Sequence, residues 1–228
     1  MTNKFGIEVE EVITTIAELR KVIAPANQRV MDKSIDHIDD LARRFIEKSP
    51  FLIIASQRPD KQLDLSPRGD PAGFVKIIDK RTIIIPDRTG NRRMDTFENI
   101  IQNPEIALYF LIPGNGDTLR VNGEASIIRD KKLASCFEVQ GSIPEMLLLI
   151  RIKRVMSHCP KCMIRSGLWN TNKWPDSEDV PTLAEMMVAH GKLEMSIKDM
   201  QKIVDRDARV RVYSDPEEYF GYVNLDKK

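Results

Sequence analysis

Hydrophobic residues in the middle of the chain form short runs that favour β-strands. Pro, Gly, Asn or Asp closes most of the runs, which is typical of an antiparallel sheet or barrel. From Phe51 onward the runs are FLIIAS, QLDLS, GFVKIID, RTIIIP, EIALYFLIP, TLRVNGEASII and LLLIRIKRVMSHC. We therefore predict an all-β core of six or seven strands.

Helical spacing replaces this pattern before the core. Residues 8–24 and 26–48 are predicted to be helical, because apolar positions in the second segment recur at steps of three and four residues. These apolar positions are Ile35, Ile38, Leu41 and Phe45. The polar residues between them would face the solvent.

Further helices are expected within and after the core. One runs from about Arg92 to Gln102, and two follow in TLAEMMVAH and SIKDMQKIVDRD. No repeat or Gly/Ser linker divides the chain, so we expect a single domain over 1–228. Its parts would be N-terminal helices in 1–50, the β core in 51–170 and a C-terminal helical extension in 171–228.

Composition limits the possible partners. The chain has 228 residues, 42% of them hydrophobic, which is enough for a sizeable core. Lys and Arg number 35 against 34 Asp and Glu, so the formal charge of +1 gives no overall attraction to nucleic acid or membrane. The polar N-terminal segment, the lack of a long apolar run and the odd count of 3 cysteines favour a cytoplasmic protein.

One short stretch, PDRTGNRRMD, is a candidate anion site. Arg88, Arg92 and Arg93 follow a predicted strand and precede a predicted helix, whose positive end would point at the turn. Backbone N–H groups and guanidinium forks together suit a phosphate monoester. The alternative is a solvated turn, since clusters of charged residues usually face water.

Other motifs carry less weight. Arg68-Gly69-Asp70 matches an adhesion tripeptide by chance, and GNGDTL lacks the third glycine and the helix of a dinucleotide fingerprint. His158, Cys159 and Cys162 supply three soft ligands, whereas a structural zinc site needs four. We expect no metal.

The order of these pieces resembles the pyridoxamine 5'-phosphate oxidase-like family of FMN-binding split barrels, over roughly residues 30–170. The resemblance rests on LDLSPRGD, the turn TIIIPDRTGNRR, the helix exit NIIQNP, the strand EIALYFLIP and LRVNGEA. Together with HCPKCMIRSGLW, these pieces are most similar to an uncharacterised bacterial subgroup. The lysine that many relatives carry before the helix exit is Thr96 here.

The resemblance implies a fold, a cofactor and a set of contacts. The fold would be mainly β with flanking helices (α+β), a six-stranded antiparallel split β-barrel, in a homodimer with FMN at the subunit interface. Outward residues such as Tyr109 and Leu111 would form the seam between subunits. The residues implied at the cofactor are Ser66, Arg68, Gly69, Asp87, Arg88, Asn91, Arg93, Arg120, Lys161, Arg165, Ser166 and Trp169.

The implied roles divide this set. Arg88, Asn91 and Arg93 would hold the phosphate and ribityl end, while Ser66 and Arg68 would lie on a strand that faces the flavin, with Gly69 allowing close approach of the backbone. Cations near the ring would raise its potential, and these would be Arg120, Lys161 and Arg165. Trp169 would stack on the ring or close the pocket, or else simply pack.

The function implied is an FMN-dependent oxidoreductase acting on a small molecule. Pyridoxamine 5'-phosphate oxidase activity itself ranks lower, because the C-terminal R-x-H substrate signature is absent after Trp169. The alternatives are a non-catalytic flavin-binding or stress-related protein, and a phosphate-ligand-binding module without flavin. No residue pattern identifies the substrate or the catalytic residues.

Overall fold

The computed structural model describes residues 1–213, and the chain divides into two units, Met1–Ser34 and Ile35–Lys228. The first unit holds an antiparallel hairpin and two short helices that bury none of their residues. Thr15 and Glu18 form a capping box at the start of the first helix, and Asn27 caps the second. These elements are β1 (Thr2–Lys4), β2 (Ile7–Val9), α1 (Ile16–Val22) and α2 (Gln28–Asp32).

The long helices expected over 8–24 and 26–48 are wrong in their bounds. The second is divided into α2, a two-residue strand β3 (Ser34–Ile35) and a separate helix α3 (Asp40–Lys48). Asp39 caps α3, and the N–H of Ile38 donates to the carbonyl of Lys80 at 2.7 Å, so Ile38 lies outside the helix. The helix therefore buries Ala42 and Ile46, whereas the predicted core residue Leu41 is exposed.

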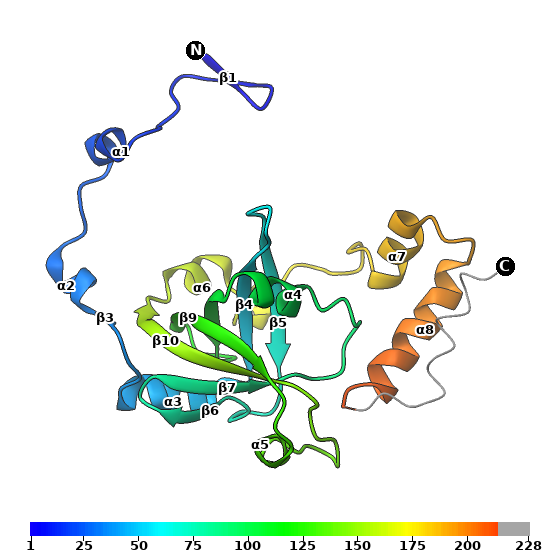
Figure 1. Ribbon diagram of the computed structural model, residues 1–228. Coiled ribbons are helices and arrows are strands. Elements are labelled where there is room, and N and C mark those ends of the chain that lie inside the picture. Colours follow the sequence, from blue (N-terminus) through cyan, green and yellow to red (C-terminus); the bar gives the residue numbers. More distant parts are fainter. Residues whose placement is uncertain (214–228) are drawn as a thin grey trace. The chain divides into compact units, whose positions relative to one another are not determined.

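An antiparallel sheet forms the centre of the second unit, as the sequence predicts. Its seven longer strands follow the order β5-β4-β8-β9-β10-β7-β6 (Figure 1). Neighbours in the chain are mostly joined by short turns, which antiparallel pairing allows. The strands are β4 (Phe51–Gln57), β5 (Leu63–Gly69), β6 (Lys76–Asp79), β7 (Thr82–Pro86), β8 (Glu105–Leu111), β9 (Thr118–Ile128) and β10 (Leu147–His158).

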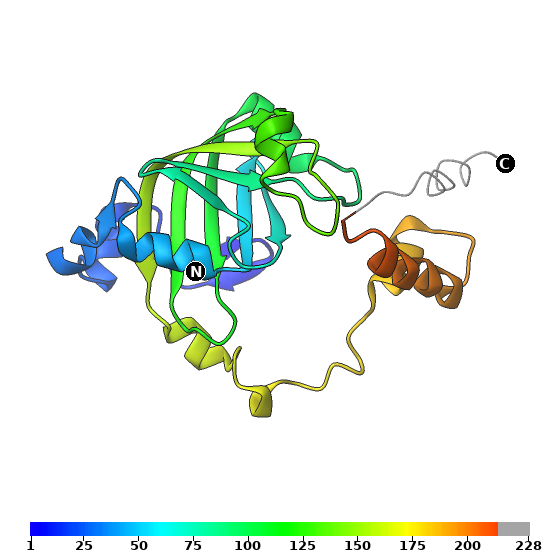
Figure 2. The same ribbon diagram turned by 90° about the horizontal axis from the view of Figure 1, so that it is seen from below.

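The sheet curves round one main hydrophobic core (Figure 2). In β4 the buried residues Leu52, Ile54 and Ser56 alternate with half-buried ones, which is the period of a strand with one face inward. Helix α3 adds Ala42 and Ile46 to this core. A smaller cluster on the other side joins β7 and β10 to Phe137, which follows a short helix.

Helices flank the sheet in the second unit. The predicted helices in 92–102, 182–190 and 196–207 are confirmed as α4 (Asp95–Gln102), α7 (Leu183–Gly191) and α8 (Ile197–Val210). Three further pieces were not predicted, because they are too short to show a helical period: α5 (Lys131–Ser135), α6 (Lys161–Ser166) and the 3-10 turn η1 (Thr171–Lys173). No helix among the described residues is long and apolar enough to cross a membrane.

Candidate functional site

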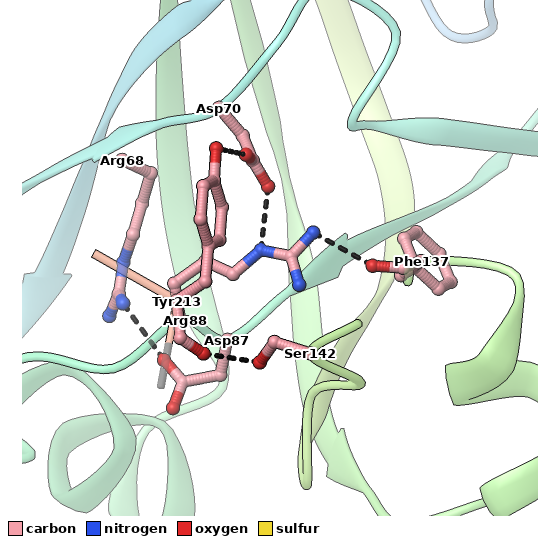
Figure 3. Close-up of polar contacts among 7 residues, drawn as sticks. All are labelled: Arg68, Asp70, Asp87, Arg88, Phe137, Ser142 and Tyr213. Atoms are coloured by element: carbon pink, nitrogen blue, oxygen red, sulfur yellow. Dashed lines mark hydrogen bonds and ion pairs between the residues drawn. The ribbon is translucent and has the colours of Figure 1, made fainter. Parts of the chain in front are cut away.

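The turn after β7 divides its arginines between the interior and the solvent. Arg88 is directed inward, with 14% of its side chain exposed, and its Nε donates to Asp70 Oδ2 at 2.6 Å. Its Nη2 donates to the carbonyl oxygen of Phe137 at 2.8 Å (Figure 3). The carboxylate of Asp70 is 1% exposed, so this is a buried ion pair between the end of β5 and the turn. Breaking such a pair from one side leaves a charge without compensation.

Tyr213 completes the surroundings of this ion pair. Its hydroxyl donates to Asp70 Oδ1 at 2.8 Å, and its ring lies 5.5 Å from the guanidinium carbon of Arg88 (Figure 3). Both oxygens of Asp70 therefore accept a hydrogen bond. Burial, followed by the hydrogen bond to Asp70, raises the pKa of Tyr213, so the hydroxyl keeps its proton at neutral pH.

A second ion pair joins β5 to the turn. Nη1 of Arg68 donates to Asp87 Oδ1 at 2.9 Å (Figure 3). The guanidinium carbon of Arg68 also lies 5.7 Å from the ring centre of Phe97 in α4. Burial raises the pKa of Asp87 above its ordinary value, and the charge of Arg68 offsets part of the rise. Arg68 and Asp87 thus fix the start of the turn against the strand and the helix.

The other half of the turn faces the solvent. Asn91, Arg92 and Arg93 are exposed, and the Asn91 side chain accepts from the backbone N–H of Arg93 at 3.1 Å. Arg93 keeps 70% of its side chain exposed and donates from Nε to Asp95 Oδ2 at 2.7 Å. This hydrogen bond raises the pKa of Arg93 and lowers that of Asp95. Among the described residues, the guanidinium of Arg93 is therefore held by a surface carboxylate alone, a kind of pair that contributes little to stability.

The predicted residues on β5 face the core side of the sheet. Residues directly opposite one another in paired strands share a face. Ser66 lies opposite Ile54, and Arg68 lies opposite Leu52, which are both fully buried. Ser66 and Arg68 therefore belong to the same side of the sheet as the core and α4.

Arg120 lies on the opposite face of the sheet. It pairs with Tyr109 of β8 and Met156 of β10, and Tyr109 pairs with Ile53, which is adjacent to Leu52 and so faces the other way. Its Nη2 lies 4.0 Å from the sulfur of Met156. On the same face the Thr118 hydroxyl donates to the Tyr109 hydroxyl oxygen at 2.9 Å.

The last group of predicted residues follows β10. Lys161, Arg165 and Ser166 are exposed on α6, and the Ser166 hydroxyl donates to the carbonyl of Met163 at 3.2 Å. The indole N–H of Trp169 donates to the carbonyl of Asn115 at 2.7 Å, which anchors this segment to the loop between β8 and β9. Trp169 thus has a structural contact within this chain.

Three of these arginines keep a buried guanidinium nitrogen without a hydrogen-bond partner among the described residues. Among the residues that the structure describes, Nε of Arg68, Nη1 of Arg88 and Nε of Arg120 are buried and have no hydrogen-bond partner. A buried donor that remains unpaired costs about 1–3 kcal/mol, more when it is charged. Donors of this kind suit a ligand rich in acceptor oxygens or nitrogens.

Three observations differ from what the sequence suggested. Asp70, which in the sequence is part of a chance tripeptide, accepts hydrogen bonds from Arg88 and Tyr213. The sequence predicts none of three residues at this place: Asp70, Ser142 and Tyr213. Tyr213 is separated from Asp70 by 143 residues, so no local pattern could have paired them. A Cβ on Gly69 would meet its nearest neighbours at 3.5 Å, an ordinary contact, so among the described residues none requires glycine at this position.

The cysteines form no evident site. Cys136, Cys159 and Cys162 are exposed free thiols. Within residues 1–213, no group of three or more His, Cys, Asp or Glu side chains could hold a metal ion.

Comparison with known proteins identifies one family. The sequence profile described as pyridoxamine 5'-phosphate oxidase matches residues 38–159. No curated protein matches the chain. This match covers β4 to β10 and includes the turn with Arg88 and Arg93, as well as Arg68 and Arg120.

Solved structures resemble about half of this chain. A variant of HupZ from Group A Streptococcus has 20% sequence identity and a TM-score of 0.43, covering 53% of this chain and 99% of that one. A Clostridium acetobutylicum protein related to general stress protein 26 has 14% identity and a TM-score of 0.40, covering 54% and 91%. An FMN-binding protein from Syntrophomonas wolfei has 14% identity and a TM-score of 0.39, covering 51% and 88%.

Proposed function

This chain belongs to the pyridoxamine 5'-phosphate oxidase family, and on that basis we propose that it is a flavoprotein that binds FMN. We further propose that it is an FMN-dependent oxidoreductase that acts on a small molecule. The observation that carries the proposal is that the family match contains the turn Asp87–Arg93 and the arginines with unpaired buried donors.

The donors of the chain fit this cofactor. FMN carries a phosphate dianion at one end and an acceptor-rich ring at the other. Arg68, Arg88 and Arg120 each keep a buried N–H without a partner among the described residues, and such groups gain most from a charged acceptor. These positions are spread over two faces of the sheet, so they would serve different parts of a cofactor.

Arg93 and Asn91 are the residues that we assign to the phosphate. Exposed ion pairs contribute only about 0–1 kcal/mol, so Arg93 can leave Asp95 for a phosphate dianion at little cost. Arg88 has a different role in this proposal, because its guanidinium is already bound to Asp70 and Phe137. It would support the turn from inside and offer its remaining Nη1.

Arg120 and the α6 segment are assigned to the ring end. FMN, when bound, supplies the transfer of electrons between a donor and a small-molecule acceptor. A positive charge such as Arg120 beside it favours its more negative state. Arg165 and Lys161 are exposed, and they can approach a ligand held by a neighbouring subunit.

A homodimer would bring the two groups to one ligand. Within one chain Arg68 and Arg120 lie on opposite faces of the sheet, so one cofactor cannot readily contact both groups. The face that carries Arg120 and Tyr109 continues onto β5, where Leu63 and Leu65 are 77% and 68% exposed. Apolar side chains of this size are covered when two copies associate.

The absorption spectrum of the purified protein tests the cofactor. We expect a bound-flavin spectrum, after reconstitution if necessary, and extraction should yield FMN rather than FAD because the turn suits a terminal phosphate. A colourless protein that ignores FMN in a titration would refute the proposal. Turnover with reductants and small-molecule acceptors then separates an enzyme from a non-catalytic flavin-binding protein.

A further inference from the structure

Arg211 and Tyr213, in the C-terminal extension, contact the turn that the proposed function assigns to phosphate and the ion pair beside it. Arg211 follows α8, and 11% of its side chain is exposed. Its Nη1 donates to Asp207 Oδ1 at 2.8 Å, and its Nη2 donates to the carbonyl oxygen of Gly90 at 3.0 Å. The guanidinium of Arg211 therefore joins the C-terminal end of α8 to Gly90, in the middle of the Asp87–Arg93 turn.

Tyr213 makes the second connection, two residues later. Its hydroxyl and ring contact the Asp70–Arg88 pair, as described above, and its carbonyl oxygen accepts a hydrogen bond from the Ser142 hydroxyl (Figure 3). Arg211 and Tyr213 thus reach the turn at Gly90 and at Arg88. These contacts join Arg211 and Tyr213 to three segments that are distant in the sequence, at Asp70, at the Asp87–Arg93 turn and at Ser142.

The backbone of the turn needs such support. Arg92 and Met94 have φ angles of 62° and 59°, which is the left-handed region that side chains other than glycine disfavour. Each such residue costs roughly 1–2 kcal/mol and persists when the surrounding structure determines its conformation. Inside the turn itself, Asn91 accepts from the N–H of Arg93. The contacts from Arg211 and Tyr213 add constraints from outside.

We propose that Arg211 and Tyr213 are positioning residues that hold the Asp87–Arg93 turn in its ligand-binding conformation. This inference rests on the proposed function in that the ligand is the phosphate of FMN. A turn that is already ordered pays less conformational entropy when it binds, so its affinity for the phosphate is higher. The C-terminal extension lies outside the family match over residues 38–159, and in this proposal it stabilises the phosphate-binding turn.

Two substitutions and a matched control test this role. Tyr213→Phe keeps the ring over Arg88 and removes only the hydroxyl, and Arg211→Ala removes the contact with Gly90. Arg209→Ala is the control, because Arg209 is exposed on the same helix and donates to the carbonyl of Asp205 within it. Each full-length variant is measured for FMN and riboflavin affinity, and for amide hydrogen exchange at Gly90–Met94 without ligand.

The expected result is selective. Exchange at 90–94 should become about tenfold faster in Tyr213→Phe and in Arg211→Ala, and FMN should bind about tenfold more weakly, the scale of one lost hydrogen bond. Riboflavin should change less than about twofold, since it has no phosphate for the turn to hold. Arg209→Ala should match the wild type in all three measurements.

Other outcomes overturn the inference or the proposed function separately. Unchanged exchange at 90–94 in both variants shows that Arg211 and Tyr213 do not position the turn. Equal weakening of FMN and riboflavin assigns these residues to the fold alone, and also overturns the inference. A wild-type protein that binds neither flavin refutes the proposed function and the phosphate ligand, while the exchange measurement still decides whether the two residues order the turn.

Discussion

At the scale of single residues, two arginines of the same turn have opposite environments. Arg88 is bound to a carboxylate that is 1% exposed, whereas Arg93 is 70% exposed and bound to Asp95 at the surface. The first pair stabilises the structure only as long as both partners remain, while the second contributes little to stability. Arg93 can therefore be removed without loss of the fold, which makes it the better probe of phosphate binding.

Arg93→Ala should weaken FMN by about 2–3 kcal/mol, the scale of a lost charge-assisted contact. Riboflavin affinity and the melting temperature should stay close to those of the wild type. Titration of both flavins by fluorescence measures the difference. Equal weakening of the two flavins would show that Arg93 does not contact the phosphate.

The buried carboxylate of Asp87 predicts a pH dependence of stability. Burial raises its pKa above the ordinary value of 3.8, so the folded state binds its proton more tightly than the unfolded state does. The contribution of Asp87 to the free energy of unfolding is fully present below pH 3.8, and it is lost as the pH rises through the raised pKa. Asp87→Asn removes this dependence, because the amide does not titrate.

Denaturant unfolding of wild type and Asp87→Asn at several pH values between about 3 and 7 checks this prediction. The free energy of unfolding of the variant, relative to the wild type, should increase as the pH rises. A difference that stays constant, or that falls over this range, would contradict a raised pKa at Asp87.

At the scale of elements, the pairing of β9 with β10 depends on a glycine. A Cβ on Gly123 would lie 2.3 Å from the carbonyl oxygen of Arg151, which is backbone and cannot move aside cheaply. The register of the two strands shifts between Ile152 and Arg154, directly beside this position. A bulge beside a glycine brings the two backbones together and bends the sheet. Gly69 on β5, in contrast, has space for a methyl group.

Gly123→Ala should therefore destabilise the protein by about 1–3 kcal/mol, as overpacking against backbone does. Gly69→Ala is the matched control and should stay within about 0.5 kcal/mol of the wild type. Thermal or denaturant unfolding measures both variants. A Gly69→Ala variant that binds FMN more weakly at unchanged stability would show that Gly69 serves the ligand. A Gly123→Ala variant as stable as the wild type would contradict the close approach of Gly123 to the carbonyl oxygen of Arg151.

At the scale of the whole molecule, the candidate residues form two groups on different faces. Arg68 lies on the core side of the sheet and is paired with Asp87 of the turn, while Arg120 lies on the opposite face of the sheet. The α6 segment with Arg165 follows the strand that pairs with Arg120. In the proposed homodimer, a second copy of the chain would bring both groups to one site.

Co-expression of Arg93→Ala with Arg165→Ala tests this arrangement. We expect each variant alone to lose FMN. In a mixed dimer one site then carries both substitutions and the other carries neither, because a two-fold symmetric dimer has two equivalent sites. FMN binding should therefore return to about one site per mixed dimer. The flavin content of isolated mixed dimers measures the recovery. No recovery in well-folded mixed dimers would place both arginines in the same subunit's site, and a monomer that binds FMN tightly would refute a shared site.

Much of the fold could be predicted from the sequence, because the relevant signals are local. The alternation in FLIIAS and the apolar runs of β7, β8 and β10 determine strands, since each residue's burial depends on the period of its own segment. The order of the pieces also identified the family, and the match over 38–159 confirms it. The predicted N-terminal helices are too long, because an apolar period continues through Asp39, where a cap begins a new helix.

Only the tertiary structure decided which side chains of the candidate site lie together. The sequence places Arg88 and Arg93 in the same short turn, but in the structure Arg88 pairs with the buried Asp70 while Arg93 stays in the solvent. Asp70, Phe137 and Tyr213 meet around Arg88 from positions far apart in the chain. Such contacts depend on how strands and loops pack in space, and the hydrophobic pattern of a single segment contains no information about a partner 143 residues away.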